Sequence, residues 1–412
     1  MKPKKKDSAA KAGKVEKLAV IGTGLMGQGI ATVSAPLCST ILMKDVSLEA
    51  AAKGMDGVWK DLDRLAETGK ISKFERDARY GKLVPCADYS NFKNTGIAIE
   101  AVFEDLSLKK KILKDTEDAT GEDAIFASNT SAIPIQSIAE GASRPENVVG
   151  MHYFSPVPRM PLLEIIAAKK TAPWVTERAL SFGRLQGKKC IVVRDGPAFY
   201  TTRILMFMIE QAMRLLEEGA DFHEVDDAMK KFGFPVGSVT LVDEIGVDVI
   251  AHVSEEVGPI WKRRGITPSQ GFKKLLDAGM LGRKAGKGFY RYDVPKVEDR
   301  RQINGEALPV IGAAEKKSFT VDEIQNRVGL TMVSEAIYCL EEGIISSPAD
   351  GDLGATLGLG FPFNTGGPFK YADARGISEI LKIYEELHER LGAAFRPPDL
   401  LADMVKAGRK FY

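Results

Sequence analysis

The stretch that most constrains this chain lies near its start, where a glycine-rich turn stands between two short apolar runs. The first run ends just before Gly22, and the second run is followed by an acid, Asp45. We expect Gly22 to make a tight turn, Gly24 to let backbone N–H groups approach a phosphate, and Gly27 to pack a helix against a strand. The positive end of that helix favours phosphate charge. The order strand, turn, helix, strand, acid is typical of a fold that binds adenine dinucleotides.

Asp45 indicates which dinucleotide the turn binds. A glycine pattern alone is weak evidence, but here both flanking runs and the acid stand at the expected places. A carboxylate at this position accepts hydrogen bonds from both ribose hydroxyls and repels a 2′-phosphate. The sequence therefore favours NAD(H) over NADP(H) as the cofactor.

Composition excludes several other classes of protein. A formal net charge of +1 over 412 residues gives no general attraction to nucleic acids or membranes. No apolar run approaches the roughly 20 residues that a transmembrane helix needs. The scattered cysteines and histidines form neither a disulfide framework nor a metal-ligand cluster, so we expect a reducing compartment and no metal site. The lysine-rich residues 1–14 are predicted to be a disordered basic tail.

The pattern changes once along the chain. Residues 15–197 alternate between strand-like and helix-like stretches, which predicts a Rossmann-type α/β domain with a parallel, doubly wound sheet. The following residues 198–292 read as helical, with expected helices over 222–232 and 238–256. A polar, irregular segment, residues 293–320, is predicted to be a linker, and residues 321–412 are helical again. The expected fold is an α/β Rossmann-type nucleotide-binding domain followed by two all-α helical repeat domains.

The two helical domains repeat each other in sequence. The segment from Arg203 to Gly219 lines up with the segment from Arg327 to Gly343. Each carries an apolar stripe that must be buried against something. The two stripes are Met206, Ile209, Met213 and Leu216 in the first domain, and Val328, Met332, Ile337 and Leu340 in the second. We therefore predict that the two domains pack on each other within one chain, which favours a monomer, and that the second has no active site of its own.

His152 is the strongest candidate for a catalytic residue. A histidine in an apolar run is by default a satisfied core residue, but here Glu164 stands at the matching place on the next run. An acid on one ring nitrogen fixes the tautomer and raises the proton affinity of the ring, which is how a general base for an alcohol is built. Glu104 and Ser131 each follow a predicted strand, which fits the ligand edge of the sheet and the start of a helix equally well.

Several segments together resemble one family. They are residues 22–29, 100–105, 127–131, 150–156, 195–197, 282–290 and 358–362. In these segments the chain resembles the L-3-hydroxyacyl-CoA dehydrogenases of fatty-acid β-oxidation. It is most similar to the dehydrogenase half of the alpha subunit of the mitochondrial trifunctional complex. The resemblance extends over nearly the whole chain from Val15 onward.

The resemblance implies roles for individual residues. It makes His152 the catalytic base, Glu164 its partner, and Ser131 the contact to the 3-oxygen of the substrate. Thr202 joins this catalytic set; single-function members carry an asparagine there, whereas the trifunctional type resembles this chain. The expected cofactor contacts are Gly22, Gly24, Leu25, Met26, Gly27, Asp45, Ala101, Val102, Glu104, Lys109 and Asn129.

The implied activity is the NAD-dependent oxidation of L-3-hydroxyacyl-CoA to 3-ketoacyl-CoA. The alternative is a non-catalytic NAD- or acyl-CoA-binding protein on the same fold. A hydroxyacid dehydrogenase with a lysine base on a long helix is disfavoured, because residues 199–218 contain no lysine. The hydratase domain of the alpha subunit has no counterpart in this sequence, so we expect hydratase activity to be missing. The resemblance also implies a thiolase-like partner, with the mitochondrial matrix as the compartment in a eukaryote and the cytoplasm otherwise.

Overall fold

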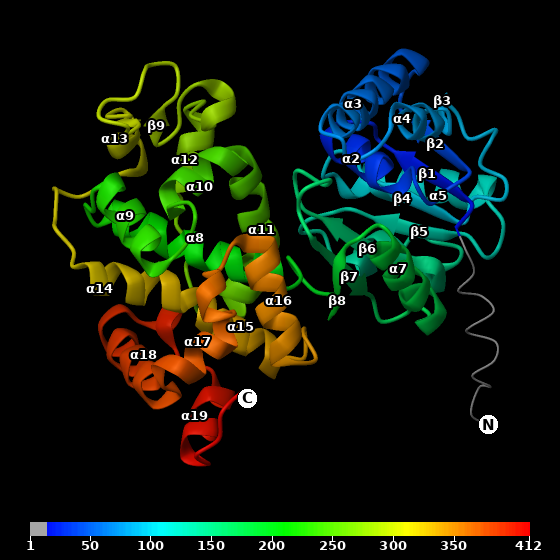
Figure 1. The fold of residues 1–412 in the computed structure, drawn as a ribbon. Coiled ribbons are helices and arrows are strands. Elements are labelled where there is room, and N and C mark those ends of the chain that lie inside the picture. The colour runs from blue at the N-terminus through cyan, green and yellow to red at the C-terminus, as the bar shows by residue number, and fades with distance from the viewer. Residues whose placement is uncertain (1–14) are drawn as a thin grey trace. The chain divides into compact units, whose positions relative to one another are not determined.

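The structure is a computed structural model that describes residues 15–412. The predicted basic tail at residues 1–14 lies outside the described residues. The chain divides into two compact units, Met1–Gly196 and Pro197–Tyr412 (Figure 1). Among residues 15–412, no helix is both long enough and apolar enough to cross a bilayer.

The first unit is built on an eight-stranded sheet with the strand order β3-β2-β1-β4-β5-β6-β7-β8. The strands are β1 (Lys17–Ile21), β2 (Thr40–Lys44), β3 (Leu83–Cys86), β4 (Ile97–Glu100), β5 (Ile125–Ser128), β6 (Val148–Tyr153), β7 (Leu162–Ala167) and β8 (Lys189–Arg194). From β3 to β6 all neighbours are parallel, as the sequence predicted.

The last two strands correct that prediction. β7 is antiparallel to β6, and β8 is parallel to β7. A parallel connection needs a crossover of a dozen or more residues, usually a helix. The proline-rich loop at residues 154–161 is too short for one, so the chain turns back directly. The expectation of a wholly parallel sheet was therefore wrong at this edge.

Helices cover the sheet and shape the ligand edge. They are α2 (Leu25–Ser34), α3 (Leu48–Glu67), α4 (Lys73–Tyr80), α5 (Leu106–Ala119), α6 (Ile135–Ala139) and α7 (Pro173–Leu185). One core unites α2, α3 and α7 with alternate strand residues such as Leu18 and Val20. Helices α5 and α6 pack against β4, β5 and β6 instead. The start of α3 follows from its sequence, because the hydroxyl of Ser47 accepts a hydrogen bond from Ala50 N at 3.1 Å.

The second unit is predominantly helical. Its main helices are α8 (Thr201–Glu217), α9 (Phe222–Phe232), α10 (Ser238–Ile245), α11 (Val247–Arg264), α12 (Gly271–Asp277), α13 (Ala307–Ile311), α14 (Val321–Ile324), α15 (Leu330–Glu341), α16 (Pro348–Leu359), α17 (Pro368–Arg375), α18 (Ile377–Leu391) and α19 (Asp399–Lys406). The single helix predicted over 238–256 is wrong. Gly246 breaks it into two helices with a φ of +107°, a conformation that favours glycine.

The predicted linker at residues 293–320 is more ordered than its composition suggested. It contributes the strand β10 (Gln302–Ile303), which pairs with β9 (Tyr290–Arg291), and the helix α13. The backbone N–H of Ala314 donates to the carbonyl of Glu217 at 2.8 Å. This segment therefore packs on the first helical repeat.

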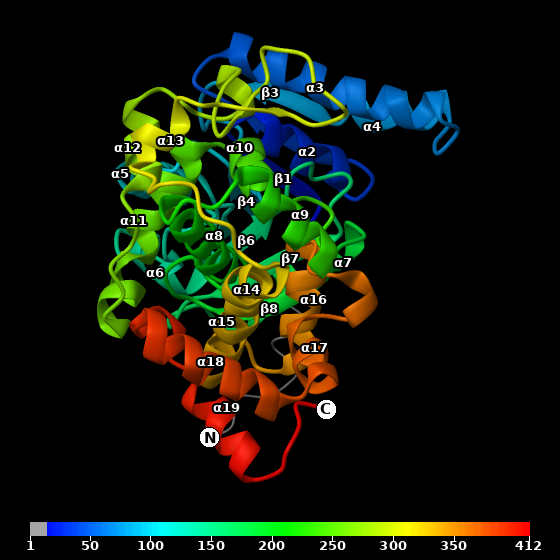
Figure 2. The same ribbon diagram turned by 90° about the vertical axis from the view of Figure 1, so that its left-hand side faces the viewer.

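The two repeated segments pack on each other through α8 and α15 (Figures 1 and 2). All residues of the predicted apolar stripes are buried, apart from Leu340, which is half-buried. They do not all face this contact, since the sulfur of Met213 lies against Gly271 of α12. Arg203 makes two hydrogen bonds to Glu342, at 2.8 and 3.0 Å. Arg327, the counterpart of Arg203, makes two to Glu218, at 2.7 and 2.6 Å. The ion pairs are reciprocal, as they are across a two-fold dimer contact.

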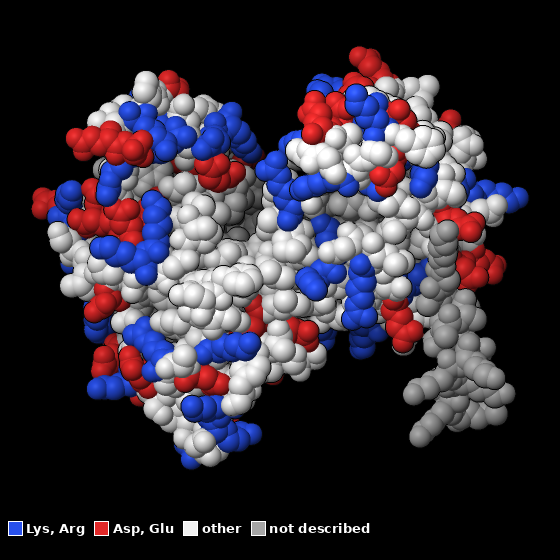
Figure 3. Space-filling view, in the orientation of Figure 1, with Lys and Arg blue, Asp and Glu red and all other residues white. Residues whose placement is uncertain are grey.

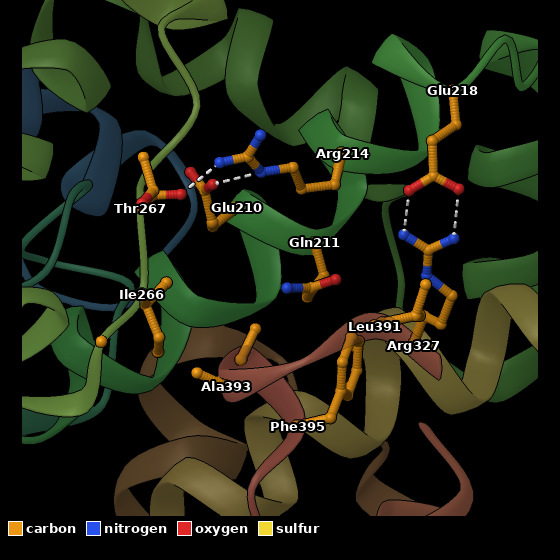
Figure 4. Close-up of a pocket in the computed structure, with 12 residues that line it drawn as sticks. Glu210, Gln211, Arg214, Glu218, Ile266, Thr267, Arg327, Leu391, Ala393 and Phe395 are labelled. Atoms are coloured by element: carbon orange, nitrogen blue, oxygen red, sulfur yellow. Dashed lines mark hydrogen bonds and ion pairs between the residues drawn. The ribbon is translucent and has the colours of Figure 1, made fainter. Parts of the chain in front are cut away.

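The reciprocity does not extend to Glu335, the second acid that Arg203 binds. The Nε of Arg203 donates to Glu335 at 2.5 Å, and Arg264 adds a second ion pair to the same carboxylate. The residue that corresponds to Glu335 is Gln211, which lines a cavity of about 300 Å³ together with Arg327 (Figure 4). One end of the contact is thus filled by charged side chains, and the other end is open.

The surface of the helical unit agrees with the balanced composition. Acidic and basic side chains are interspersed on its visible face (Figure 3). On this face the pattern is consistent with the net charge of +1 and forms no extended basic surface.

Candidate functional site

The glycine turn has the geometry that a dinucleotide requires. Gly22 has a φ of +90°, and a Cβ there would lie 2.5 Å from the carbonyl oxygen of Ala101. A Cβ on Gly27 would lie 1.9 Å from the carbonyl oxygen of Gly22. Gly24, the N-cap of α2, faces open space, and no side chain caps the helix. The first-turn N–H groups are therefore available to a phosphate, so these residues fit the pyrophosphate of a dinucleotide.

Asp45 lies directly after β2, beside this turn. Its Oδ2 accepts hydrogen bonds from the backbone N–H and the hydroxyl of Thr23, at 2.8 and 2.7 Å. Its Oδ1 accepts a hydrogen bond from Val46 N at 2.8 Å. Burial raises the pKa of the Asp45 carboxyl, but these hydrogen bonds outweigh burial and hold the pKa below its usual value. Asp45 is therefore a fixed anion. Sequence reasoning missed Thr23, whose hydroxyl within the turn was the available signal.

The remaining predicted cofactor residues follow β1 and β4. Leu25 and Met26 form the first turn of α2, and the side chain of Leu25 is 69% exposed. The backbone N–H of Ala101 donates to Ile21 at 2.7 Å, which brings the end of β4 against the turn. Val102 follows and donates its N–H to Glu100 at 2.8 Å. Direct contact of these residues with a cofactor stays a prediction.

Glu104 and Lys109 form a network at the end of β4. Lys109 is only 1% exposed, and its ammonium lies 2.8 Å from Glu100 and 3.1 Å from Glu104. Glu104 also accepts hydrogen bonds from the hydroxyl of Thr130 and from the N–H of Ser131. Burial raises the pKa of Glu104, but Lys109 and these hydrogen bonds outweigh it and lower the pKa. Glu104 is thus an anion that holds the loop carrying Ser131.

Asn129 connects that loop to the next strand. Its Oδ1 accepts a hydrogen bond from the backbone N–H of Tyr153 at 2.9 Å. Tyr153 follows His152 on β6, so the predicted cofactor residue Asn129 also fastens the strand that carries the predicted base. Ser131, Asn129 and His152 therefore share one edge of the sheet.

His152 and Glu164 form the pair that the sequence predicted. They are direct partners in the register of β6 and β7, and the ring Nδ1 lies 2.9 Å from the Glu164 carboxylate. His152 is 5% exposed and Glu164 is fully buried. Because an ionised carboxylate only accepts hydrogen bonds, this contact places a hydrogen on Nδ1. The pair is therefore held in one tautomer at the carboxyl edge of β6.

The loop between these two strands is anchored by a lysine that the sequence did not single out. The ammonium of Lys188 donates to the carbonyls of Val157 and Met160, the latter at 2.7 Å. Burial lowers the pKa of Lys188 to about 8. Val157 packs against Gly29 of α2, where a Cβ would lie 2.7 Å from the valine Cβ. The loop after His152 is thus fixed to the helix that follows the glycine turn.

Comparison with known proteins decides the family. The model of the NAD binding domain of 3-hydroxyacyl-CoA dehydrogenase matches residues 17–196. The model of the C-terminal domain of the same enzyme matches residues 199–292 and residues 324–411. The chain belongs to the 3-hydroxyacyl-CoA dehydrogenase family.

Relatives in that family include longer proteins. The chain is 41% identical over 404 residues to the fatty acid oxidation complex subunit alpha of Shewanella amazonensis, covering 98% of this chain and 57% of that protein. It is 42% identical to the same subunit of Shewanella frigidimarina, over 97% of this chain and 56% of that protein. The chain thus spans little more than half the length of these curated relatives.

Solved structures of family members match as well. The 3-hydroxybutyryl-CoA dehydrogenase of Escherichia coli K12 superimposes with a TM-score of 0.83 at 26% identity, over 96% of this chain and 99% of that one. The (S)-3-hydroxybutyryl-CoA dehydrogenase PaaH1 of Ralstonia eutropha is 35% identical, with a TM-score of 0.65, over 68% of this chain and 99% of that chain.

Thr202, which the resemblance includes in the catalytic set, belongs to the helical unit. It lies in the first turn of α8 and is half-buried. Its catalytic role stays a prediction. Within residues 15–412, His, Cys, Asp and Glu side chains form no group of three or more that could hold a metal ion.

Proposed function

We propose that this chain oxidises L-3-hydroxyacyl-CoA thioesters to 3-ketoacyl-CoA with NAD+, as a step of fatty-acid β-oxidation. The observation that carries the proposal is the His152–Glu164 pair, which lies in the same sheet as the glycine turn. Family membership supports the cofactor and the thioester class. The solved relatives named as 3-hydroxybutyryl-CoA dehydrogenases support the 3-hydroxy position as the site of reaction.

Three side chains have distinct roles in the proposed reaction. Glu164 holds Nδ1 of His152, so proton transfer from the 3-hydroxyl falls to Nε2. The buried carboxylate of Glu164 then stabilises the imidazolium that forms. The hydroxyl of Ser131, on the loop held by Glu104, hydrogen-bonds the 3-oxygen. NAD+, when bound, supplies the hydride acceptor for C3.

The cofactor would be held by the glycine turn and Asp45. The N–H groups at the start of α2 would bind the pyrophosphate, and the Asp45 carboxylate would bind the ribose hydroxyls. Asp45 already accepts hydrogen bonds on both oxygens, so it is oriented before a ribose arrives. Glu104 would line the cofactor and acyl cleft.

A steady-state assay tests the proposal. NADH oxidation is followed with acetoacetyl-CoA and then with a long-chain 3-ketoacyl-CoA, and NADH binding is measured separately by fluorescence. We expect turnover with at least one thioester, and loss of turnover with retained NADH binding in His152→Gln. Tight NADH binding without any turnover would favour the non-catalytic alternative instead.

We also propose that the two repeated helical segments form two repeat domains that imitate a dimer contact within one chain. The reciprocal pairs Arg203–Glu342 and Arg327–Glu218 support this arrangement. Truncation after residue 320 tests it, because the exposed α8 face should make the protein insoluble or dimeric. A soluble, fully active, monomeric fragment would contradict it.

Partners remain a separate proposal. The Shewanella relatives are named as subunits of a fatty acid oxidation complex, which supports a thiolase-like partner for this chain. Co-elution with a purified 3-ketoacyl-CoA thiolase in size-exclusion chromatography would test it. The compartment stays a prediction.

A further inference from the structure

Glu100 is a buried carboxylate to which neither the sequence nor the comparisons give a role. It is the last residue of β4 and is fully buried. Its Oε1 accepts hydrogen bonds from Lys109 and from Val102 N, both at 2.8 Å. Its Oε2 accepts a hydrogen bond from the hydroxyl of Ser128 at 2.6 Å. Glu100 therefore joins the ends of two central strands to one lysine.

The position of Glu100 in the sheet places it below the candidate site. In the strand register it lies between Ile21 of β1 and Ser128 of β5. The glycine turn follows Ile21, and the loop with Asn129 and Ser131 follows Ser128. Because it is fully buried, Glu100 does not itself meet a cofactor or substrate in this geometry. Any effect on the reaction must act through its neighbours.

Lys109 transmits that effect. Its ammonium bridges Glu100 and Glu104, which are 0% and 27% exposed. Glu104 in turn accepts hydrogen bonds from the N–H groups of Ser131 at 3.0 Å and Ala132 at 3.3 Å. A continuous chain of charge-assisted contacts thus runs from Glu100 through Lys109 and Glu104 to Ser131.

One carboxylate would be enough to neutralise Lys109, so the second needs a reason. Glu104 is attached to a loop and is partly exposed, whereas Glu100 is fixed by Ser128 and by the Val102 N–H. Without Glu100 the ammonium keeps its partner but loses its attachment to the sheet. Glu100 therefore contributes position rather than neutralisation.

We propose that Glu100 is a positioning residue for the oxidation, which fixes Lys109 and Glu104 so that the Ser131 hydroxyl meets the 3-oxygen of the substrate. The inference rests on the role proposed above for Ser131. It differs from a purely structural role because its effect on the substrate passes through one named side chain.

A double-mutant cycle tests this inference. Glu100→Gln should lower kcat roughly ten- to hundredfold, because a shift of about 1 Å in a contacting group has effects of that size. Ser131→Ala removes the hydroxyl through which Glu100 acts. The double variant should then turn over at the rate of Ser131→Ala alone, since residues that act as one unit are non-additive. Independent, multiplying losses in the double variant would overturn the proposal.

Two further measurements keep the outcome clear. The dissociation constant of acetoacetyl-CoA, measured by calorimetry, should follow the same non-additive cycle, and this readout does not need turnover. A wild-type protein without turnover would count against the proposed function, whereas an additive binding cycle would count against Glu100. Glu100→Asp keeps the charge but withdraws it from Lys109, and should show the same cycle if Glu100→Gln does not fold.

Glu117→Gln is the matched control. Glu117 is another mostly buried carboxylate in the same unit, 8% exposed, and it binds the backbone N–H groups of Ser143 and Arg144. Among residues 15–412, the hydrogen bonds and the ion pair of its carboxylate are with Ser143 and Arg144, and none is with the loop that carries Ser131. Its replacement should leave kcat and the acetoacetyl-CoA affinity of the folded protein unchanged. An equal loss of kcat in this control would show a general response to lost buried charge and would overturn the assignment.

Discussion

The two units of this protein bury charged side chains in different settings. In the α/β unit, the buried charges gather at the carboxyl edge of the sheet, where His152 pairs with Glu164 and Lys109 pairs with Glu104. In the helical unit, Arg203 lies between helices and is 2% exposed, as is its partner Glu335. In the function proposed above, the first set orients groups toward the reaction, whereas the second set joins two repeated segments.

The comparison teaches that burial alone does not identify a catalytic group. An ion pair between helices contributes to specificity of packing, and its loss should appear as lost stability. A pair at the ligand edge should instead appear as lost turnover in a protein that still folds. Substitutions in the two sets should therefore separate into losses of stability and losses of turnover.

The largest effect is expected from Arg203→Met. Arg203 is the more deeply buried of the two arginines that Glu335 and Glu342 share, and the variant leaves them only Arg264 in common. The unfolding free energy should therefore fall by up to about 3–5 kcal/mol, the cost of removing one member of a buried pair. Urea unfolding measures it. The control is Arg390→Met in the same unit, because Arg390 is 59% exposed in its pair with Glu323 and should cost at most about 1 kcal/mol. Equal losses in the two variants would contradict the assigned difference.

Glu164→Gln should reduce turnover rather than stability. A neutral amide neither fixes the imidazole as well nor stabilises the imidazolium, so kcat should fall about 10²–10⁴-fold, the usual size of a general-base contribution. NADH affinity should stay within about twofold, since Glu164 lies away from the glycine turn in the strand order. Stopped-flow and fluorescence titration measure the two quantities. Near-normal turnover would contradict the assignment of His152 as the catalytic base.

Asp45→Ser should change the preference for NADH over NADPH, by a smaller factor than Glu164→Gln changes kcat. The variant loses a charged acceptor for the ribose hydroxyls, which is worth about tenfold or more in NADH affinity. NADPH should be affected less, because the repulsion of its 2′-phosphate disappears together with the carboxylate. Dissociation constants for both cofactors measure the shift. Equal changes for NADH and NADPH would show that Asp45 is not the ribose acid.

The smallest effect is expected in the pH dependence of stability. Burial raises the pKa of Glu342, but the guanidinium groups of Arg203 and Arg264 outweigh burial and lower it from 4.5 to about 2. A lowered carboxyl pKa contributes stability that is present above pH 4.5 and is lost as the pH falls toward about 2. Between pH 4.5 and about 2, the free energy of unfolding should depend less on pH in Glu342→Gln than in the wild-type protein. An unchanged slope would remove this ion pair as a source of acid sensitivity.

The sequence predicted those parts that depend on local pattern. The tight turn at Gly22 and the close packing at Gly27 were predicted from spacing, and in the structure a backbone oxygen lies within 2.5 Å of where a Cβ would stand at either residue. The pairing of His152 with Glu164 was also predicted, from their matching places on successive apolar runs, and the register of β6 and β7 confirms it. The helix over 222–232 was predicted with its observed bounds.

What escaped prediction depends on contacts between distant residues. Glu100 stands at the end of an apolar run, which was a signal, but its partners Lys109 and Ser128 follow from the strand register. Lys188 binds two carbonyls of a loop whose path the sequence does not specify. The reversal at β7 was missed because alternating elements suggested a uniform parallel sheet.

The antiparallel turn from β6 to β7 has a consequence for how this protein can be recombined. It places the proposed base and its acid 12 residues apart in the chain, whereas the partners of Arg203 are 132 and 139 residues away. Exchanging residues 148–167 with a homologue would therefore carry both proposed proton-transfer groups together. The helical contact has no such cassette, so a crossover anywhere between its halves separates side chains that adapted to each other. Chimaeras made by such exchanges should therefore keep their turnover more readily than their folding stability.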